Sequence, residues 1–282
     1  MDPVLARKMW RTLEPYHGLV YFTPYATRAY AALGITGQAG YFASRAAPMG
    51  PVPAGVVVAT FYNFNPEIVR AAIPAAWSAA SPADVVTARL GAIDRALREV
   101  LGDDAVASPE VVEAATLARR AAAGCMPEGR PLFAAHAELA WPAEPHLALW
   151  HAVTILREFR GDGHVAALVT EGLDGCEALV THGAAGGDNP PATILRTTRG
   201  WSDAAWAAAG DRLRDRGLLD AGDALTPAGV TVRDRVERVT DDRAMAPWRR
   251  LGEDEADRLR TLVRPFSKAV AASGAFRAGP AS

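Results

Sequence analysis

The chain has 282 residues, of which 50% are hydrophobic and 22% are charged, and its formal net charge is −2. This composition excludes a disordered chain, and the balanced charge argues against a broad nucleic-acid or anionic-membrane footprint. The amino-terminal residues contain no apolar signal core and no run is long enough to span a bilayer, so we expect a cytoplasmic protein with no membrane partner. The two cysteines, Cys125 and Cys176, are expected to be buried free thiols.

The first half of the chain predicts helices separated by proline and glycine. Two longer helices have a serine N-cap followed by proline, and we expect them at about 82–101 and 109–123. Residues 54–62 are rich in β-branched side chains, which is typical of a strand, but the flanking helices favour a helix. Shorter helices are expected at 4–13, 23–34, 38–47 and from Asn65 onward.

The stretch from Tyr16 to Tyr62 is unusually aromatic, and two interpretations of it remain open. Aromatic side chains in a helical domain commonly form its core. A pocket lined by aromatic rings with a few polar groups is also how proteins bind small ligands. Under the second interpretation, the candidate ligand-binding residues are Tyr21, Tyr41, Arg45, Tyr62 and Asn63.

The stretch from Trp150 to Gly183 organises the chain. Apolar residues recur at three- and four-residue steps from Pro145, which predicts an amphipathic helix that ends at Gly161. Asp162 is then expected to cap a second, shorter helix, and Asp174 to cap a third. The sequence therefore predicts a corner between helices near Gly161.

Polar side chains concentrate around this corner and also have two interpretations. In a structural role, their ion pairs would hold the helices together. In a functional role, arginine would hold a carboxylate or phenolate and histidine would exchange a proton near neutral pH. The candidate catalytic residues are His151, Glu158 and His164, and the candidate ligand-binding residues are Trp150, Arg157 and Arg160.

The spacings of these side chains are not those of known metal or phosphate sites. His151, Glu158 and His164 do not follow a zinc-site pattern. The chain also has no glycine-rich phosphate loop and no nucleophile elbow. We therefore expect no metal and no cofactor.

The segment after residue 200 predicts a helix from Ser202 to Gly217, two very short strands, a helix at 227–243 and a last helix at 253–273. The string GDRLRDRGLLD…ALTPAGVTVRDRV resembles the recognition helix, wing and following helix of MarR-like winged-helix proteins. The resemblance covers residues 145–275 and implies a winged-helix domain in a homodimer. It is carried by Leu213, Gly217, Leu218, Leu219, Leu225, Thr226 and Gly229.

The whole chain also resembles an actinobacterial helix-turn-helix family, through its layout and the string from Arg157 to His164. This second resemblance implies the same architecture and no particular activity.

In MarR-like proteins the first turns of the recognition helix meet base edges, and basic residues contact phosphates. The matching residues here, 201–206, include no Asn, Gln, Arg or Lys to read a base. The turn of the wing would place Asp220 and Asp223 near phosphates, and only Arg196 and Arg199 lie nearby to compensate. The sequence therefore predicts weakened DNA binding.

We expect a mainly α protein with a helical, aromatic-rich domain at 1–144, a MarR-like winged helix with a very short β-wing at 145–275, and a disordered tail at 276–282. Two functions remain open. The first is a small-molecule-binding protein, or a cofactor-independent enzyme of secondary metabolism, that uses the winged helix as a scaffold. The second is a ligand-responsive transcriptional regulator that binds DNA as a dimer. The expected ligand is an aromatic or apolar molecule with an acidic or phenolic group.

Overall fold

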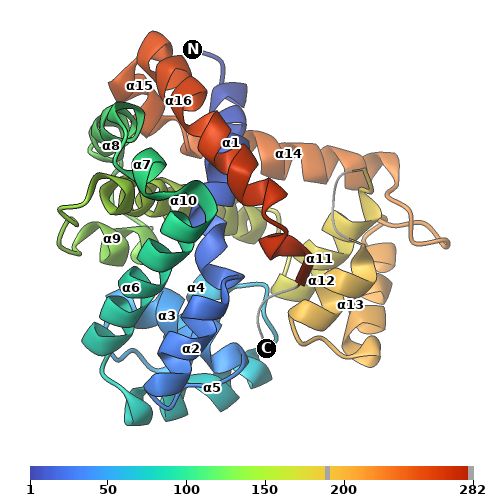
Figure 1. Cartoon of the computed structure of the whole chain (residues 1–282). Helices are drawn as coiled ribbons and strands as arrows, with labels where there is room; N and C mark the ends of the chain where they lie inside the picture. Colours follow the sequence, from blue (N-terminus) through green and yellow to red (C-terminus); the bar gives the residue numbers. More distant parts are fainter. Residues whose placement is uncertain (188–190, 279–282) are drawn as a thin grey trace. The chain divides into compact units, whose positions relative to one another are not determined.

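The computed structural model describes residues 1–187 and 191–278, and this part of the chain is mainly helical (Figure 1). The residues that lie close together in space form two compact units. Unit 1 comprises residues 1–52, 72–162 and 241–282, and unit 2 comprises residues 53–71 and 163–240. Each unit is assembled from separated stretches of the chain, whereas the sequence predicts consecutive domains that meet at residue 144.

Unit 1 contains most of the helices. Its α-helices are α1 (Val4–Gly18), α2 (Pro24–Ala32), α3 (Gln38–Ala46), α6 (Pro82–Leu101), α7 (Asp103–Val106), α8 (Pro109–Ala122), α9 (Pro131–Ala137), α15 (Ala246–Leu251) and α16 (Glu253–Ala272). Its 3₁₀ turns are η1 (Leu19–Tyr21), η2 (Ala47–Met49) and η3 (Ala275–Ala278).

Unit 2 is smaller and also helical. It contains α4 (Ala54–Phe61), α11 (Gly175–Ala184), α12 (Ala192–Thr198) and α13 (Asp203–Asp215). Three further helices contribute residues to both units: α5 (Pro66–Ala79), α10 (Pro145–Thr170) and α14 (Pro227–Arg243).

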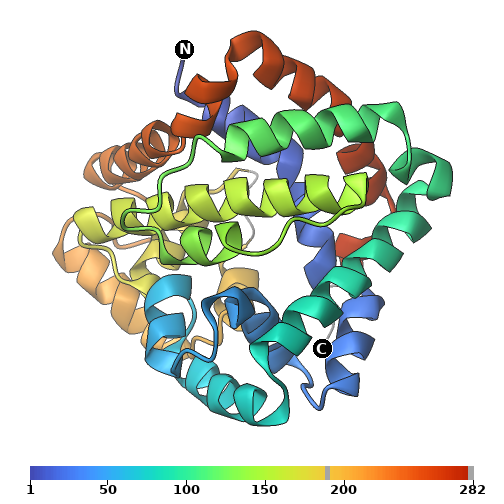
Figure 2. The ribbon, with the colours of Figure 1, turned by 90° about the vertical axis from the view of Figure 1, so that its left-hand side faces the viewer.

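The core of unit 1 is built around the first part of α10, which crosses the middle of the view in Figure 2. A helix that is apolar on all sides must be buried on all sides. That is the case here, because the buried residues fall at nearly every position of the helix: Leu147, Leu149, Trp150, Ala152, Val153, Ile155, Leu156 and Phe159.

The first and last long helices of unit 1 pack against each other (Figure 1). Helix α1 contributes Leu5, Met9 and Leu13 to the common core, at the three- and four-residue spacing of one helix face. Helix α16 contributes residues of the same kind, among them Leu259 and Val263. The fold of unit 1 therefore depends on both ends of the chain.

Unit 2 has its own core. It joins the end of α10 to α11, α13 and α14 through Leu168, Cys176, Leu213 and Val236. Asp174 caps α11 as the sequence predicts, since its side chain accepts hydrogen bonds from the backbone N–H groups of Cys176 and Glu177.

The predicted corner at Gly161 is wrong, because α10 continues without a break from Pro145 to Thr170. A glycine inside a helix costs only about 1 kcal/mol, which burial along this helix outweighs. Asp162 is not an N-cap of a new helix. Its Oδ2 accepts from the backbone N–H of Phe133 (2.9 Å) and so caps α9, whose own N-cap residue makes no side-chain bond.

Other expectations from the sequence have mixed outcomes. The helix expected at 54–62 is confirmed by α4, and Cys125 and Cys176 are free thiols, the first of them half-buried. The two short strands of the wing are not formed in the described residues, where a single antiparallel bridge joins Leu219 to Leu225. The predicted disordered tail at 276–282 begins within η3, and residues 279–282 lie outside the described part. No helix in the described part is long and apolar enough to cross a membrane.

Candidate functional site

A buried ion pair joins α3 to α10 in unit 1. Arg45 donates from Nε and Nη2 to the two carboxylate oxygens of Glu158, at 2.9 and 2.8 Å. This is the two-pronged geometry that favours arginine over lysine. Glu158 is 0% exposed, and burial alone would raise its pKa. Arg157 and Arg45 outweigh burial and hold the pKa of Glu158 well below its usual range, so the carboxylate stays ionised.

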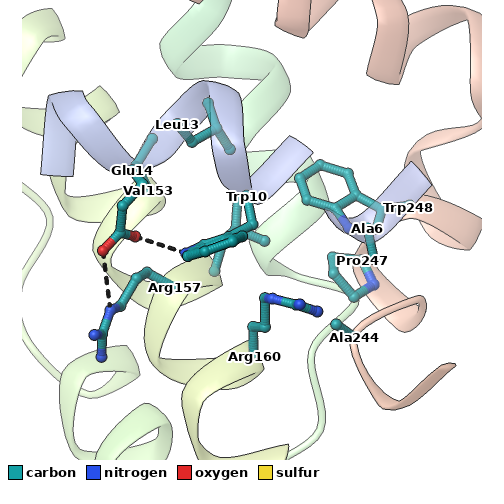
Figure 3. A pocket seen from close by; sticks show the side chains of 11 residues that line it. Ala6, Trp10, Leu13, Glu14, Val153, Arg157, Arg160, Ala244, Pro247 and Trp248 are labelled. Carbon is teal, nitrogen blue, oxygen red and sulfur yellow. Dashed lines mark hydrogen bonds and ion pairs between the residues drawn. The ribbon is translucent and has the colours of Figure 1, made fainter. Parts of the chain in front are cut away.

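Arg157 connects this buried pair to a surface groove, shown in Figure 3. Its Nη1 donates to Glu158 (2.7 Å), and its Nε lies 3.8 Å from a carboxylate oxygen of Glu14. Glu14 in turn accepts from the indole N–H of Trp10 (2.9 Å). Arg157 therefore bridges a fully buried carboxylate and a partly exposed one.

The groove itself is lined by side chains of α1, α10 and α15, with Arg160 beside Trp10 (Figure 3). The guanidinium of Arg160 lies 5.2 Å from the centre of the Trp10 ring and donates to Asp241 (2.8 Å). The groove encloses ≈ 20 Å³, which is room for about one water molecule. It can admit one edge of a ligand but cannot enclose one as it stands.

The aromatic candidates of unit 1 form a layer beside the Arg45–Glu158 pair. The rings of Tyr21 and Tyr41 lie 5.0 Å apart, and His17 meets the edge of Tyr21 at 5.5 Å. Trp150 stacks on His17 at 6.4 Å and donates from its indole to the His17 carbonyl oxygen. The structure thus brings Tyr21, Tyr41 and Trp150 together with Arg45.

Arg89 of α6 belongs to the same layer and is absent from the candidates drawn from the sequence. It is 3% exposed, donates to the carbonyl oxygen of Ser44 (3.2 Å) and to the Tyr21 hydroxyl (2.9 Å), and lies 4.9 Å from the centre of the Trp150 ring. A signal for it exists in the sequence. Arg89 stands four residues after Val85 and four before Ile93, on the apolar face of its helix, where an arginine needs a specific reason.

The charge of Arg89 acts on three buried histidines: His17 of α1, His136 of α9 and His151 of α10. Burial and then nearby cations, Arg89 among them, lower the pKa of each below its usual value, and that of His151 falls to about 4. All three are therefore neutral near pH 7. We call these three histidines and Arg89 the Arg89 cluster.

The hydrogen bonds of His17 fix its tautomer. Its Nδ1 lies 3.0 Å from the hydroxyl oxygen of Thr154, and that hydroxyl donates its proton to the carbonyl oxygen of Trp150. The hydroxyl can therefore only accept from His17, so Nδ1 carries the proton and Nε2 has a free lone pair. Within the described part, Nε2 of His17 has no partner, and neither has Nε2 of His136, Nε2 of His151 or Nε of Arg89.

The remaining candidates lie in unit 2 and make local contacts there. The Nδ1 atom of His164 lies 3.0 Å from the hydroxyl of Thr240. Tyr62 donates from its hydroxyl to the carbonyl oxygen of Leu173, and the carbonyl of Asn63 accepts from the indole of Trp201 (2.9 Å). The predicted set is thus divided between the units, with Tyr62, Asn63 and His164 in unit 2 and the others in unit 1.

Unit 2 contains a helix–turn–helix made of α12, a short turn and α13. Gly200 adopts a positive φ of 73° in the turn, and the side chain of Ser202 accepts from the N–H of Ala205 to cap α13. A left-handed residue in such a turn is normally glycine, because a Cβ is strained there. The cap and helix expected from the sequence at this position are confirmed.

The side chains that α13 exposes to solvent are mostly short, and several of them are acidic. Its exposed residues are Asp203, Ala204, Ala207, Ala208, Asp211, Arg212 and Asp215, and Arg212 pairs with Asp174 and Glu177. The flanking arginines are engaged inside unit 2. Arg196 pairs with Asp203, and Arg214 pairs with Asp211 and Asp223.

The local backbone geometry explains why the wing motif has glycine and threonine at its key positions. Gly217 has a positive φ of 67°, and the hydroxyl of Thr226 donates to its carbonyl oxygen (2.6 Å). The same Thr226 oxygen accepts from the N–H of Gly229 (3.1 Å) and so caps α14. A Cβ on Gly229 would collide with the carbonyl oxygen of Leu218, so only glycine fits there.

A family model described as a helix-turn-helix family matches residues 6–277. No curated protein and no solved structure matches the chain. Within the described residues, no group of three His, Cys, Asp or Glu side chains is placed to share a metal ion.

Proposed function

The chain belongs to this helix-turn-helix family, and we propose that it binds a small molecule within unit 1 while its helix–turn–helix has a mainly structural role. The observation that carries the proposal is the Arg89 cluster. Its four side chains are less than a tenth exposed, and each has a polar atom without a partner in the described part. Buried polar atoms are nearly always satisfied, so a group of them in one place calls for an occupant.

The helix–turn–helix supports the second half of the proposal. DNA affinity comes mainly from arginine and lysine on phosphates, and base reading comes from amides and guanidinium groups. The exposed face of α13 carries mainly alanine and aspartate, and its exposed Arg212 pairs with Asp174 and Glu177. Arg196 and Arg214 would have to leave their aspartate partners before either could contact a phosphate.

The protonation state of His151 and the ion pairs of Glu158 favour binding over catalysis. A general base works best when its pKa is near the working pH. The pKa of His151 is lowered to about 4 by burial and by nearby arginines, which makes it a weak base at neutral pH. Glu158 is occupied by Arg45 and Arg157.

A second function, a ligand-responsive MarR-like regulator that binds DNA, is favoured by the intact turn at Gly200 and by the motif at Thr226 and Gly229. A direct DNA titration separates the two. In fluorescence anisotropy with DNA from upstream of its own gene, we expect only weak association without sequence preference. Sub-micromolar binding that weakens steeply with salt would favour the regulator.

The small-molecule proposal is tested by native mass spectrometry of the protein purified from its natural host. We expect an added mass that disappears on denaturation and whose chemical identity can be read from the extract. A protein that carries no small molecule, and whose melting temperature no compound of a metabolite library raises, would contradict the proposal.

A further inference from the structure

We infer that Arg89 holds the carboxylate of a small aromatic acid in unit 1. This inference rests on the proposed function and names the chemistry that its site would recognise. It goes beyond the sequence-based candidates, in which the acid was assigned to Arg157 or Arg160.

The charges of the buried residues identify Arg89 as the group that lacks a counterion. Arg45 and Arg157 share the carboxylate of Glu158, and Arg157 also lies near Glu14. Arg89 pairs with no carboxylate in the described part of the chain and is held by a carbonyl oxygen and a phenol. A buried guanidinium with only neutral partners is costly, and an anion would relieve that cost.

The geometry around Arg89 leaves one edge of its guanidinium for a ligand. Nη1 is bonded to Ser44 and Nη2 to Tyr21, whereas Nε has no partner. A planar carboxylate that accepts from Nε would add a charge-assisted bond at this edge. Arg157 and Arg160 are less suited, because each already bonds a carboxylate.

The surroundings of Arg89 favour an aromatic body with a hydroxyl group. Arg89 lies against the Trp150 ring, and the rings of Tyr21 and His17 continue the same layer. The free lone pair on His17 Nε2 can accept from a ligand O–H, which a simple hydrocarbon does not have. A hydroxyl-bearing aromatic acid satisfies both the arginine and the histidine.

Because Arg89 is 3% exposed, a ligand can reach it only when part of the aromatic layer opens. Binding that requires a conformational change associates slowly. We therefore expect a slow phase in stopped-flow measurements of tryptophan fluorescence, reported by Trp150, whose ring lies against Arg89.

The test compares 4-hydroxybenzoate with its neutral counterpart, 4-hydroxybenzyl alcohol, by isothermal titration calorimetry on the full chain. We expect the wild type to bind the acid at least about 10-fold more tightly, the effect of one charge-assisted hydrogen bond. Arg89→Met should remove this preference. Arg95→Met, the same substitution at an exposed position of α6, should keep it.

Melting temperatures without ligand provide a second readout. If Arg89 is an uncompensated charge, Arg89→Met should melt at or above the temperature of the wild type, since a buried charge has been replaced by an apolar side chain. A large fall in melting temperature would make Arg89 structural. Arg89→Lys, which keeps the charge, is the second variant and should lose about 10-fold in affinity for the acid, because an ammonium has no Nε edge.

The outcomes separate this inference from the proposed function. Equal affinity of the wild type for acid and alcohol would leave small-molecule binding in place and overturn the assignment of Arg89. Unchanged preference in both Arg89 variants would do the same. A wild type that binds neither probe would overturn the inferred ligand class, and the proposed function would then depend on the mass spectrometry alone.

Discussion

The carboxylate of Asp162 is buried at the amino end of α9, where it accepts a single backbone hydrogen bond from Phe133. Burial raises the pKa of Asp162 to about 6, above its ordinary value of 3.8, although the Phe133 bond opposes the shift. The folded state therefore holds the Asp162 proton more tightly than the unfolded state. The stability that this contributes is complete below about pH 3.8 and is lost as pH rises through about 6.

Asp162→Asn keeps an oxygen that can accept from Phe133 and removes the charge. We expect the variant to be more stable than the wild type at pH 7 by up to about 3 kcal/mol, since one pKa unit corresponds to about 1.4 kcal/mol. The difference should shrink toward pH 4, where Asp162 is protonated in the folded protein. Urea unfolding at the two pH values measures both effects, and an equal or lower stability at pH 7 would contradict the argument.

His151 titrates in the opposite sense. Burial, followed by Arg89 and Arg119, lowers its folded pKa to about 4, below its unfolded value of 6.5. The unfolded chain then binds more protons, so stability is complete above about pH 6.5 and falls as pH drops toward 4. Between pH 7 and 4, the wild type should therefore lose more of its free energy of unfolding than His151→Asn does. We expect this difference to reach up to about 3 kcal/mol. Parallel pH curves for the two proteins would show that His151 is not the titrating group.

In the Arg45–Glu158 pair each charge faces an opposite charge, unlike Arg89 in the part of the chain that the structure describes, so removing one partner should destabilise the protein. Arg45→Met leaves a fully buried carboxylate with Arg157 as its remaining hydrogen-bonded partner among the residues described here. Breaking a buried pair from one side costs about 3–5 kcal/mol, and we expect a loss of that order in chemical denaturation. Arg98→Met breaks an exposed pair on α6 and should change little, which makes it the matched control.

At the scale of helices, α10 shows how a local signal can mislead. Gly161 and Asp162 together look like the end of one helix and the cap of the next, yet the backbone stays helical through both. A Cβ on Gly161 would lie 3.4 Å from Arg157 Nη1 and 3.5 Å from Glu158 Oε2, which is ordinary contact.

Gly161→Ala therefore distinguishes a continuous helix from a corner. In a continuous helix, alanine replaces glycine in a helical conformation and should stabilise the protein by about 0.5–1 kcal/mol. Gly217→Ala is the contrasting variant, because φ there is +67° and alanine is strained. We expect thermal melts to move in opposite directions for the two variants, and a fall for both would contradict the continuous helix.

Local patterns predict the capped helices of this chain, α13 among them, but not the course of α10 through Gly161. Ser81, Ser108 and Asp174 cap helices as their spacing predicts, because a cap depends only on the next few residues. The apolar face of α6 marks Arg89 as unusual, but the sequence does not show its neighbours, because α1, α9 and α10 are distant in sequence. For the same reason, nothing in the residues near Asp162 points to its bond with Phe133 of α9.

For the whole molecule, the partition into units has a direct consequence for truncation. Helix α16 supplies Leu259, Leu262 and Val263 to the core that α1 also forms. A chain that ends at Gly252 would expose the partners of these residues, and we expect unit 1 to lose its cooperative unfolding transition. Circular dichroism melts measure this. A sharp transition at the wild-type temperature would contradict it.

The packing of α1 on α16 also bears on how the protein is made in the cell. Residues of α1 leave the ribosome well before those of α16, the helix that packs against them. At 5–20 residues per second, the stretch between α1 and α16 takes on the order of ten to fifty seconds to synthesise. Unit 2, which ends at residue 240, can be complete before unit 1. The apolar face of α1 is therefore available to chaperones during that interval.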